Sequence, residues 1–196
     1  TIVFDVNESV LENAKIFIQK NLLFLLNKQK ISGEEKENIF KRIRFVKDIK
    51  QCTADVIIEA IIEKIDAKVE LFNKLAEVNK TETIFATNTS SLSVSDIQEN
   101  ILYPERVVGM HFYNPAYLMK LVEVVKGKQT NEDIAQAIYG LCKQLGKTPV
   151  MCKDAPGFIV NRVARHYYLE AMKLVEKKIA TFENVDAIME ASGFKM

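Results

Sequence analysis

Cysteine is scarce in this sequence, and its pattern excludes two classes of site. The three cysteines, Cys52, Cys142 and Cys152, form no C-x-x-C pair. In a chain of 196 residues, such an odd and sparse set argues against a disulfide scaffold and against a thiolate metal site. We therefore expect no bound metal and a reducing, cytoplasmic location. The first residues, Thr1–Asp5, also lack the basic and long apolar regions of a signal peptide.

An excess of charge and a long apolar run are missing as well. Lys and Arg number 27 against 26 Asp and Glu, which favours neither nucleic acid nor an anionic membrane as a partner. The longest apolar run, Leu22–Leu26, is far too short to span a bilayer. Hydrophobic residues make up 48% of the chain, enough to bury a sizeable core and to exclude disorder as the main state.

Apolar periodicity predicts strands that alternate with helices. Short apolar runs predict strands at 1–4, 44–46, 55–59, 84–86, 107–112, 121–125 and 149–152. Three- and four-residue spacing predicts helices over 8–22, 39–43, 63–78, 131–145, 158–177 and 182–192. This alternation implies an α/β fold with a parallel sheet and crossover helices. Because only helix is predicted after Pro156, the pattern indicates a first domain over residues 1–155 and a helical one over 156–196.

Polar residues follow several of the predicted strands. They are Asp5, Glu59 and the segments 88–91 and 111–114. Ligands of parallel α/β sheets bind beyond the carboxyl ends of the strands, so these residues should cluster at a binding site. Taken singly, each can also be an ordinary turn or N-cap residue.

One strand end indicates acid/base chemistry. His111 ends its strand, and Glu123 lies inside the apolar run Leu121–Val125, where a charge needs a partner. A strand-end histidine beside a carboxylate makes a general acid/base, because the carboxylate fixes the tautomer and favours the imidazolium. The other interpretations are a hydrogen-bonded core histidine and an edge-strand Glu that faces water. The second histidine, His166, is expected at the surface or at a domain interface.

Asp5 ends a strand that leads directly into a helix, as the ribose-binding carboxylate of a dinucleotide fold does. That carboxylate follows a G-x-G-x-x-G loop by about 20 residues, so the loop would precede Thr1. The seven glycines contain no such cluster. Asp5 alone therefore does not establish a dinucleotide site.

Four segments, with their order and spacing, resemble one family. They are IFATNTSSL at 84–92, GMHFYNP at 109–115, MKLVEVV at 119–125 and KDAPGFIVNR at 153–162. They resemble the L-3-hydroxyacyl-CoA dehydrogenases, most closely the stand-alone bacterial 3-hydroxybutyryl-CoA dehydrogenases. The resemblance covers essentially the whole chain. It implies a Rossmann-type NAD-binding domain followed by the start of a helical substrate domain, through which the parent enzyme forms a homodimer.

The resemblance also implies catalytic roles. His111 is then the general base that takes the hydroxyl proton as hydride leaves the carbon, and Glu123 orients and polarises it. Ser90 touches both the substrate oxygen and the nicotinamide, and Asn161 helps to bind the substrate.

Further residues are implied to bind the cofactor and the CoA group. Asp5 bonds the adenosine ribose of NAD, and the cofactor cleft is lined by Ser90 together with Glu63, Lys68 and Asn114. Lys28 matches a basic position that meets the phosphate end of CoA. Asn21 stands where better-known members carry a CoA-contacting Ser.

The departures from the family pattern lie at the ends of the chain. The first strand and the Gly-rich loop are missing, and the sequence stops where the family continues with further helices. We therefore expect an internal segment of a longer enzyme, inactive on its own. In the strand order 3-2-1-4-5-6, the missing strand separates strands 1–4 and 55–59. The sheet then either collapses across this gap or stays open.

The function implied for the parent is NAD-linked, reversible oxidation of a 3-hydroxyacyl-CoA, such as 3-hydroxybutyryl-CoA, to the 3-oxoacyl-CoA in fatty-acid or butyrate metabolism. One alternative is the dehydrogenase segment of a multifunctional β-oxidation protein. Another is a non-catalytic binding protein with a dinucleotide fold. Joint retention of Ser90, His111, Glu123 and Asn161 argues against the latter, because a structural role needs no buried acid/base pair.

Overall fold

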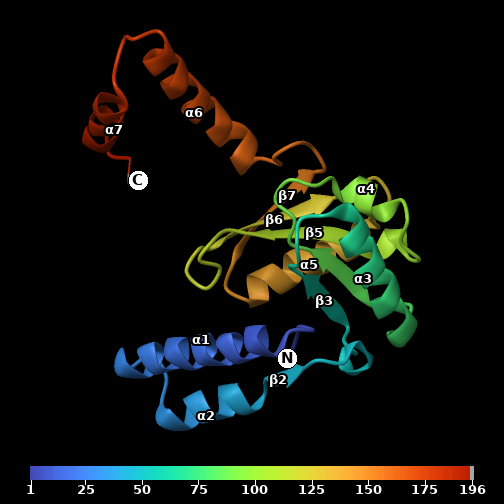
Figure 1. Ribbon diagram of the computed structural model, residues 1–196. Helices are drawn as coiled ribbons and strands as arrows, with labels where there is room; N and C mark the ends of the chain where they lie inside the picture. Colours follow the sequence, from blue (N-terminus) through green and yellow to red (C-terminus); the bar gives the residue numbers. More distant parts are fainter. Residues whose placement is uncertain (195–196) are drawn as a thin grey trace.

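The computed structural model describes residues 1–194, with a central sheet between helices (Figure 1). The strands are β1 (Ile2–Phe4), β2 (Arg44–Val46), β3 (Val56–Glu59), β4 (Ile84–Thr87), β5 (Val107–Phe112), β6 (Leu121–Lys126) and β7 (Thr148–Lys153). The α-helices are α1 (Glu8–Asn27), α2 (Gly33–Lys41), α3 (Ile65–Val78), α4 (Val94–Gln98), α5 (Glu132–Gln144), α6 (Val160–Glu176) and α7 (Phe182–Ala191). Lys195 and Met196, which end the predicted helical domain, lie outside the described residues.

The five-stranded sheet has the order β3-β4-β5-β6-β7, and its strands are parallel except for the pair β5 and β6. The predicted Rossmann-type parallel sheet is confirmed, and one antiparallel pair, which the sequence pattern does not predict, interrupts it. A parallel crossover needs a dozen or more residues, whereas the connection from Phe112 to Leu121 is short and carries no helix. The chain consequently reverses there, and β6 returns directly beside β5.

The first two strands form a separate sheet. β1 pairs in parallel with β2, in the register Ile2 to Arg44, and β3 begins the larger sheet. Of the two outcomes expected for the gap between these strands, the structure has the open one, because β1 and β3 belong to different sheets.

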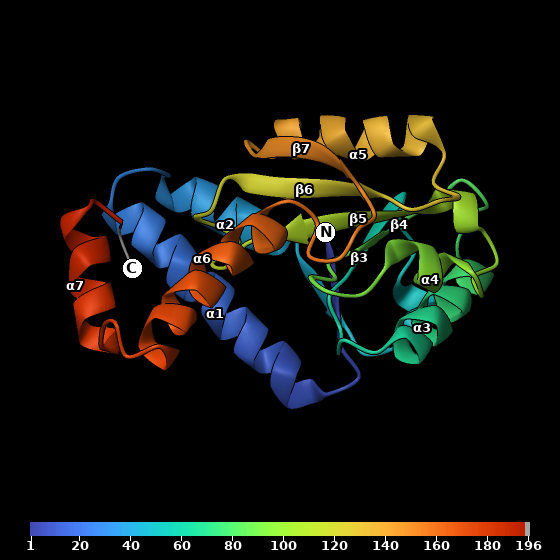
Figure 2. The same cartoon turned by 90° about the horizontal axis from the view of Figure 1, so that it is seen from above.

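Two hydrophobic cores cover the faces of the larger sheet. Alternate residues of a strand point to opposite faces. Phe85 accordingly joins the core beneath α3 and α4, whereas Ala86 joins the core beneath α5. Figure 2 shows α5 on one side of the sheet and α3 with α4 on the other. Phe72 of α3 is fully buried edge-on against Phe85, 5.4 Å between centroids, and each such ring contributes about 1.5–3 kcal/mol of burial energy. These cores fix the strand ends that carry the polar residues.

Two helices begin later than the sequence predicts, for local reasons. α3 begins at Ile65 rather than residue 63, because the backbone of its N-cap residue Lys64 is extended, with φ −134° and ψ 126°. α6 begins at Val160 rather than 158, because Gly157 and Phe158 have positive φ angles of 73° and 46°. The sequence pattern did not predict the short helix α4 or the two 3₁₀ turns, 49–51 and 104–106.

α6 and α7 extend away from the sheet (Figure 1). Within residues 1–194, no helix has the length and apolar character needed to cross a membrane.

Candidate active site

A histidine and a glutamate face each other at the centre of the sheet. His111 of β5 lies directly opposite Glu123 of β6 in the antiparallel register. His111 Nδ1 lies 2.8 Å from Glu123 Oε2, and the residues are only 5% and 1% exposed. Because β6 lies between β5 and β7, the interpretation of Glu123 as an edge residue facing water was wrong.

Four donors converge on the Glu123 carboxylate. Its Oε2 accepts from the Tyr113 hydroxyl at 2.6 Å as well as from His111. Its Oε1 accepts from the backbone N–H groups of Ile159 and Val160, at 2.9 and 3.0 Å. Burial raises the pKa of Glu123, but the bonds from Tyr113, from His111 and from the two amides outweigh burial and lower that pKa overall.

The ionised carboxylate determines the state of the His111 ring. A carboxylate without a proton can only accept, so His111 Nδ1 must carry hydrogen. In the neutral imidazole, the lone pair is then on Nε2, which points away from Glu123. This is the tautomer that a general base needs.

The start of α6 is tied to the same carboxylate. The left-handed pair Gly157 and Phe158 turns the chain so that the free N–H groups of the first helical turn meet Glu123 Oε1. A Cβ at Gly157 would approach the Arg162 nitrogen to 3.1 Å. The Phe158 ring packs edge-on against His111, 5.6 Å between centroids. Glu123 therefore joins the histidine to the helix that carries Asn161.

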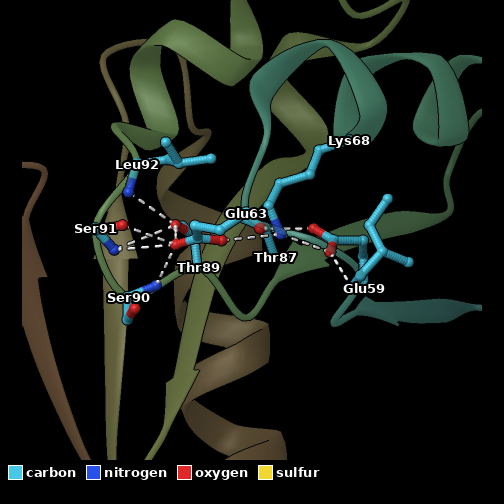
Figure 3. Close-up of polar contacts among 9 residues, drawn as sticks. Glu59, Glu63, Lys68, Thr87, Thr89, Ser90, Ser91 and Leu92 are labelled. Carbon is cyan, nitrogen blue, oxygen red and sulfur yellow. Dashed lines mark hydrogen bonds and ion pairs between the residues drawn. The ribbon is translucent and has the colours of Figure 1, made fainter.

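A second carboxylate network lies at the ends of β3 and β4 (Figure 3). Lys68 of α3 is 1% exposed, and its Nζ lies 2.7 Å from Glu59 Oε1 and 3.3 Å from Glu63 Oε2. Glu59 also accepts from the Thr87 hydroxyl at 2.8 Å and from the Ile61 N–H at 2.6 Å. The network satisfies every charged atom that it buries, as a stable buried ion pair requires.

Glu63 orders the loop that follows β4. Its Oε1 accepts from the Thr89 hydroxyl at 2.6 Å and from the backbone N–H groups of Ser90 and Ser91, at 3.0 and 3.2 Å. Burial raises the pKa of Glu63, but these bonds and the Lys68 charge outweigh it and lower the pKa to about 2. Glu63 is therefore an anion that fixes the backbone on both sides of Ser90.

Asn88 connects the two networks. Its N–H donates to the Glu59 carbonyl at 2.8 Å, and its Oδ1 accepts from the Phe112 N–H at 2.8 Å. On the far side of the same loop, Asp154 accepts from the Ser93 hydroxyl and the Ser95 N–H, at 2.7 and 2.8 Å. The loop that carries Ser90 is thus fixed at both ends.

The structure brings together six of the predicted site residues. His111 contacts Glu123, Lys68 contacts Glu63, and Glu63 contacts Ser90. Asn161 completes the set, with its Nδ2 at 3.5 Å from the Ser90 carbonyl. The Lys68 ammonium is buried and pairs with Glu63, and its place on the wall of a cofactor cleft stays a prediction.

The remaining predicted residues lie outside these networks. Asp5 ends β1 in the smaller sheet, where its Oδ1 accepts from the Asn7 N–H at 2.8 Å. Asn114 is exposed in the connection between β5 and β6. On α1, the Asn21 amide bonds the carbonyl one turn earlier in its own helix. Lys28, just past the end of α1, is exposed.

Sequence reasoning missed Tyr113, the role of Glu59 and the link through Asn88. A signal for Tyr113 was present. Residues two apart on an extended chain share a face, so a tyrosine two positions after His111 can reach the same carboxylate. Glu59 was noticed only as a polar strand end, because its partner Lys68 lies on the following helix.

Two family models match the chain, one for each of its two parts. Residues 1–155 match the NAD-binding domain family of 3-hydroxyacyl-CoA dehydrogenase, and residues 157–196 match its C-terminal domain family. The chain is 42% identical to 3-hydroxyadipyl-CoA dehydrogenase of Escherichia coli, with 100% of this chain and 42% of the relative covered. It is 36% identical to a probable 3-hydroxybutyryl-CoA dehydrogenase of Deinococcus radiodurans, covering 96% and 68%.

Among solved structures, (S)-3-hydroxybutyryl-CoA dehydrogenase from Ralstonia eutropha superposes with a TM-score of 0.92 at 30% identity. That match covers 96% of this chain and 67% of the other. The chain spans less than half of the length of the Escherichia coli relative, and 65% of a mitochondrial hydroxyacyl-coenzyme A dehydrogenase from Rattus norvegicus.

Proposed function

Because the chain belongs to the 3-hydroxyacyl-CoA dehydrogenase family, we propose that it supplies the NAD-binding and acid/base parts of an enzyme that interconverts 3-hydroxyacyl-CoA and 3-oxoacyl-CoA. The observation that carries this proposal is the buried pair of His111 and Glu123, 2.8 Å apart at a strand end. A buried histidine–carboxylate pair is costly for a structural role and suited to proton transfer, because imidazole can both accept and donate a proton.

In the oxidation direction, the substrate hydroxyl loses its proton and its carbon loses a hydride. His111 accepts the proton at Nε2, and Glu123 stabilises the resulting imidazolium through Nδ1. Ser90, whose backbone Glu63 fixes, supplies a hydroxyl for the substrate oxygen. Asn161 approaches the same loop from α6 and contributes to binding the substrate. In the reduction direction, the 3-oxo carbon regains a hydride and the His111 imidazolium returns its proton to the oxygen.

The residues at the strand ends fit a nicotinamide dinucleotide, which accepts the hydride when bound. Asp5 offers a carboxylate for ribose hydroxyls, and Val6 beside it is 76% exposed, an apolar surface suited to a purine. Asn114 and the Ser90 hydroxyl are exposed polar groups at the other end of this edge. Glu63 and Lys68 act on the cofactor cleft by fixing the Ser90 loop.

The finer assignments follow from the relatives. The Deinococcus radiodurans protein is named for 3-hydroxybutyryl-CoA, so a short-chain substrate of butyrate or fatty-acid metabolism is proposed, with Lys28 and Asn21 near its CoA group. α6 exposes Val163 and Met172, apolar side chains that suit a homodimer contact. The free, buried cysteines agree with a reducing, cytoplasmic location.

The direct test is NADH oxidation with acetoacetyl-CoA, using the natural polypeptide that contains these residues. We expect loss of the NADH absorbance with the native protein, and a rate at least 10²-fold lower with His111→Gln. A His166→Gln variant is the matched control, because that histidine is exposed on α6, and it should retain the native rate. No turnover by the native protein would refute the proposed function.

Asp5 predicts the choice of cofactor. A carboxylate accepts hydrogen bonds from the 2′-hydroxyl of NADH and repels the 2′-phosphate of NADPH, and Val6 offers no positive charge to receive it. We expect kcat/KM to be higher for NADH than for NADPH, and this preference to narrow in Asp5→Asn. Equal values for the native protein would contradict the role of Asp5.

A further inference from the structure

One oxygen of Glu123 serves two side chains. Tyr113 lies just after β5, half-buried, and its hydroxyl donates to Glu123 Oε2 at 2.6 Å. His111 Nδ1 lies 2.8 Å from that same oxygen. The His111 and Tyr113 rings pack at 4.7 Å between centroids with an angle of 56°. The three side chains therefore form one compact cluster.

We propose that Tyr113 is a positioning residue for His111. By donating to Glu123 Oε2, the oxygen that His111 also bonds, Tyr113 limits how strongly Glu123 holds the imidazole proton. The consequence for turnover rests on the proposed function, whereas the effect on His111 itself does not.

The geometry leaves Glu123 no means of separating its two partners. Its Oε1 is occupied by the backbone N–H groups of Ile159 and Val160, so the carboxylate cannot rotate to give each side chain an oxygen of its own. A hydroxyl that bonds a carboxylate withdraws charge from it, and in a buried site this effect is little screened. Without the hydroxyl, all of the Oε2 charge would act on His111 and favour the imidazolium.

The other ionisable groups near this cluster have pKa values shifted away from neutral pH. Cys152 of β7 lies two positions beyond Val150, the residue opposite Glu123, and burial, together with Glu123 and Asp154, raises the pKa of its thiol to about 12. Burial and the bond to Glu123 raise the pKa of Tyr113 above its ordinary value. Hydrogen bonds keep the pKa of Asp154 below its ordinary value despite burial. A change in His111 titration can therefore be assigned to the shared oxygen.

The test is the NMR titration of the imidazole signals in the native polypeptide and in Tyr113→Phe, which removes only the hydroxyl. The His111 signal is assigned by its loss in His111→Gln, and the signal of the exposed His166, assigned by its loss in His166→Gln, serves as an internal reference. We expect the His111 midpoint to rise by about 0.5–1 pH unit in Tyr113→Phe. Tyr117→Phe is the matched control, because Tyr117 lies in the same connection, is 65% exposed and should leave the midpoint unchanged. An unchanged or lower His111 midpoint in Tyr113→Phe would overturn the proposal.

A second measurement works in the opposite direction and keeps the aromatic ring and the hydroxyl. Incorporating 3-fluorotyrosine at position 113 makes the phenol more acidic and strengthens its bond to Glu123, so the His111 midpoint should fall. A midpoint that does not fall would again contradict the proposal, even if Tyr113→Phe folds poorly.

Kinetics then separate this inference from the proposed function. In the oxidation direction, the acidic limb of the kcat/KM profile should move to higher pH in Tyr113→Phe, parallel to the NMR midpoint. A native protein without turnover would refute the proposed function, while the NMR titration would still decide the role of Tyr113. If the native protein is active but the His111 midpoint is the same in Tyr113→Phe, only the role of Tyr113 is refuted.

Discussion

Two buried carboxylate networks lie at the polar end of the sheet, and they differ in the partner that each carboxylate binds. Glu59 binds the ammonium of Lys68, whereas Glu123 binds the imidazole of His111. A lysine partner keeps its charge near neutral pH, whereas a histidine partner can gain or lose a proton there. The first network is therefore suited to fixing a loop, and the second to moving a proton.

The two networks also differ in what their outer atoms contact. The Lys68 ammonium also pairs with Glu63, and Glu63 accepts the hydrogen bond that fixes the backbone at Ser90. Glu123 instead binds the first amides of α6. The first network thus joins strand ends to a neighbouring loop within the sheet domain. The second joins the sheet to the helix that follows it. Substitutions in the two should damage stability and activity in different proportions.

The largest expected effect tests the proton-moving network. In Glu123→Gln, the amide oxygen can still accept from the N–H groups at the start of α6, which turns the NH₂ group toward His111. An NH₂ group donates to Nδ1, so the imidazole hydrogen moves to Nε2 and the base is lost. We expect kcat to fall by about 10²–10⁴-fold with the fold retained. Steady-state kinetics measures kcat, and thermal unfolding tests whether the fold is retained. A normal kcat would contradict the assigned mechanism.

The next effect tests the loop-fixing network. Lys68→Met leaves two carboxylates without the charge between them, and breaking such a buried pair costs about 3–5 kcal/mol of unfolding free energy. The double variant with Glu59→Gln should recover part of that loss, because it removes one unpaired charge. The matched control is Lys74→Met on the same helix, whose exposed pair with Glu70 contributes at most about 1 kcal/mol. Urea unfolding measures the unfolding free energy of all three variants. Equal losses in Lys68→Met and Lys74→Met would contradict the stabilising role of the buried Lys68 pair.

The sequence predicted much of the fold because the strands are short apolar runs with clear ends. Phe85 and its neighbours, for example, form a short apolar run that is followed by polar residues, and the structure buries them in a strand. The reversal at β6 was missed because periodicity reports which face a residue occupies and not the direction of the strand. Only the length of the connection after Phe112 carried that information.

The site was predictable where its residues are adjacent in the sheet. His111 and Glu123 stand out because each is polar in an apolar run, so each needed a partner. The burial of Lys68 could not be predicted, because its helical position says nothing about which way its long side chain turns, and its partner Glu59 lies on another element. Tyr113 was missed because its ring fits beside an apolar strand, and the sequence does not show which group its hydroxyl reaches.

The smallest expected effect concerns Glu63, which lies at the exposed end of the loop-fixing network. Hydrogen bonds from Thr89 and Ser90 and the charge of Lys68 overcome burial and lower its pKa from the ordinary 4.5 to about 2. A carboxyl whose pKa is lower in the folded state stabilises the fold above its unfolded pKa. This contribution is lost as the pH falls from about 4.5 toward 2. The unfolding free energies of the native protein and Glu63→Gln should therefore differ most near neutral pH and converge in acid.

Urea titrations at about pH 6 and about pH 3 measure this convergence. Because the Glu63 side chain is about one third exposed, we expect the difference at the higher pH to be well below that for Lys68→Met. Glu77→Gln is the reference, because Glu77 is exposed on the same helix, and it accounts for the general effect of removing one negative charge. A difference for Glu63→Gln that stays constant with pH, after this reference is subtracted, would mean that Glu63 fixes the Ser90 loop through its shape rather than through its charge.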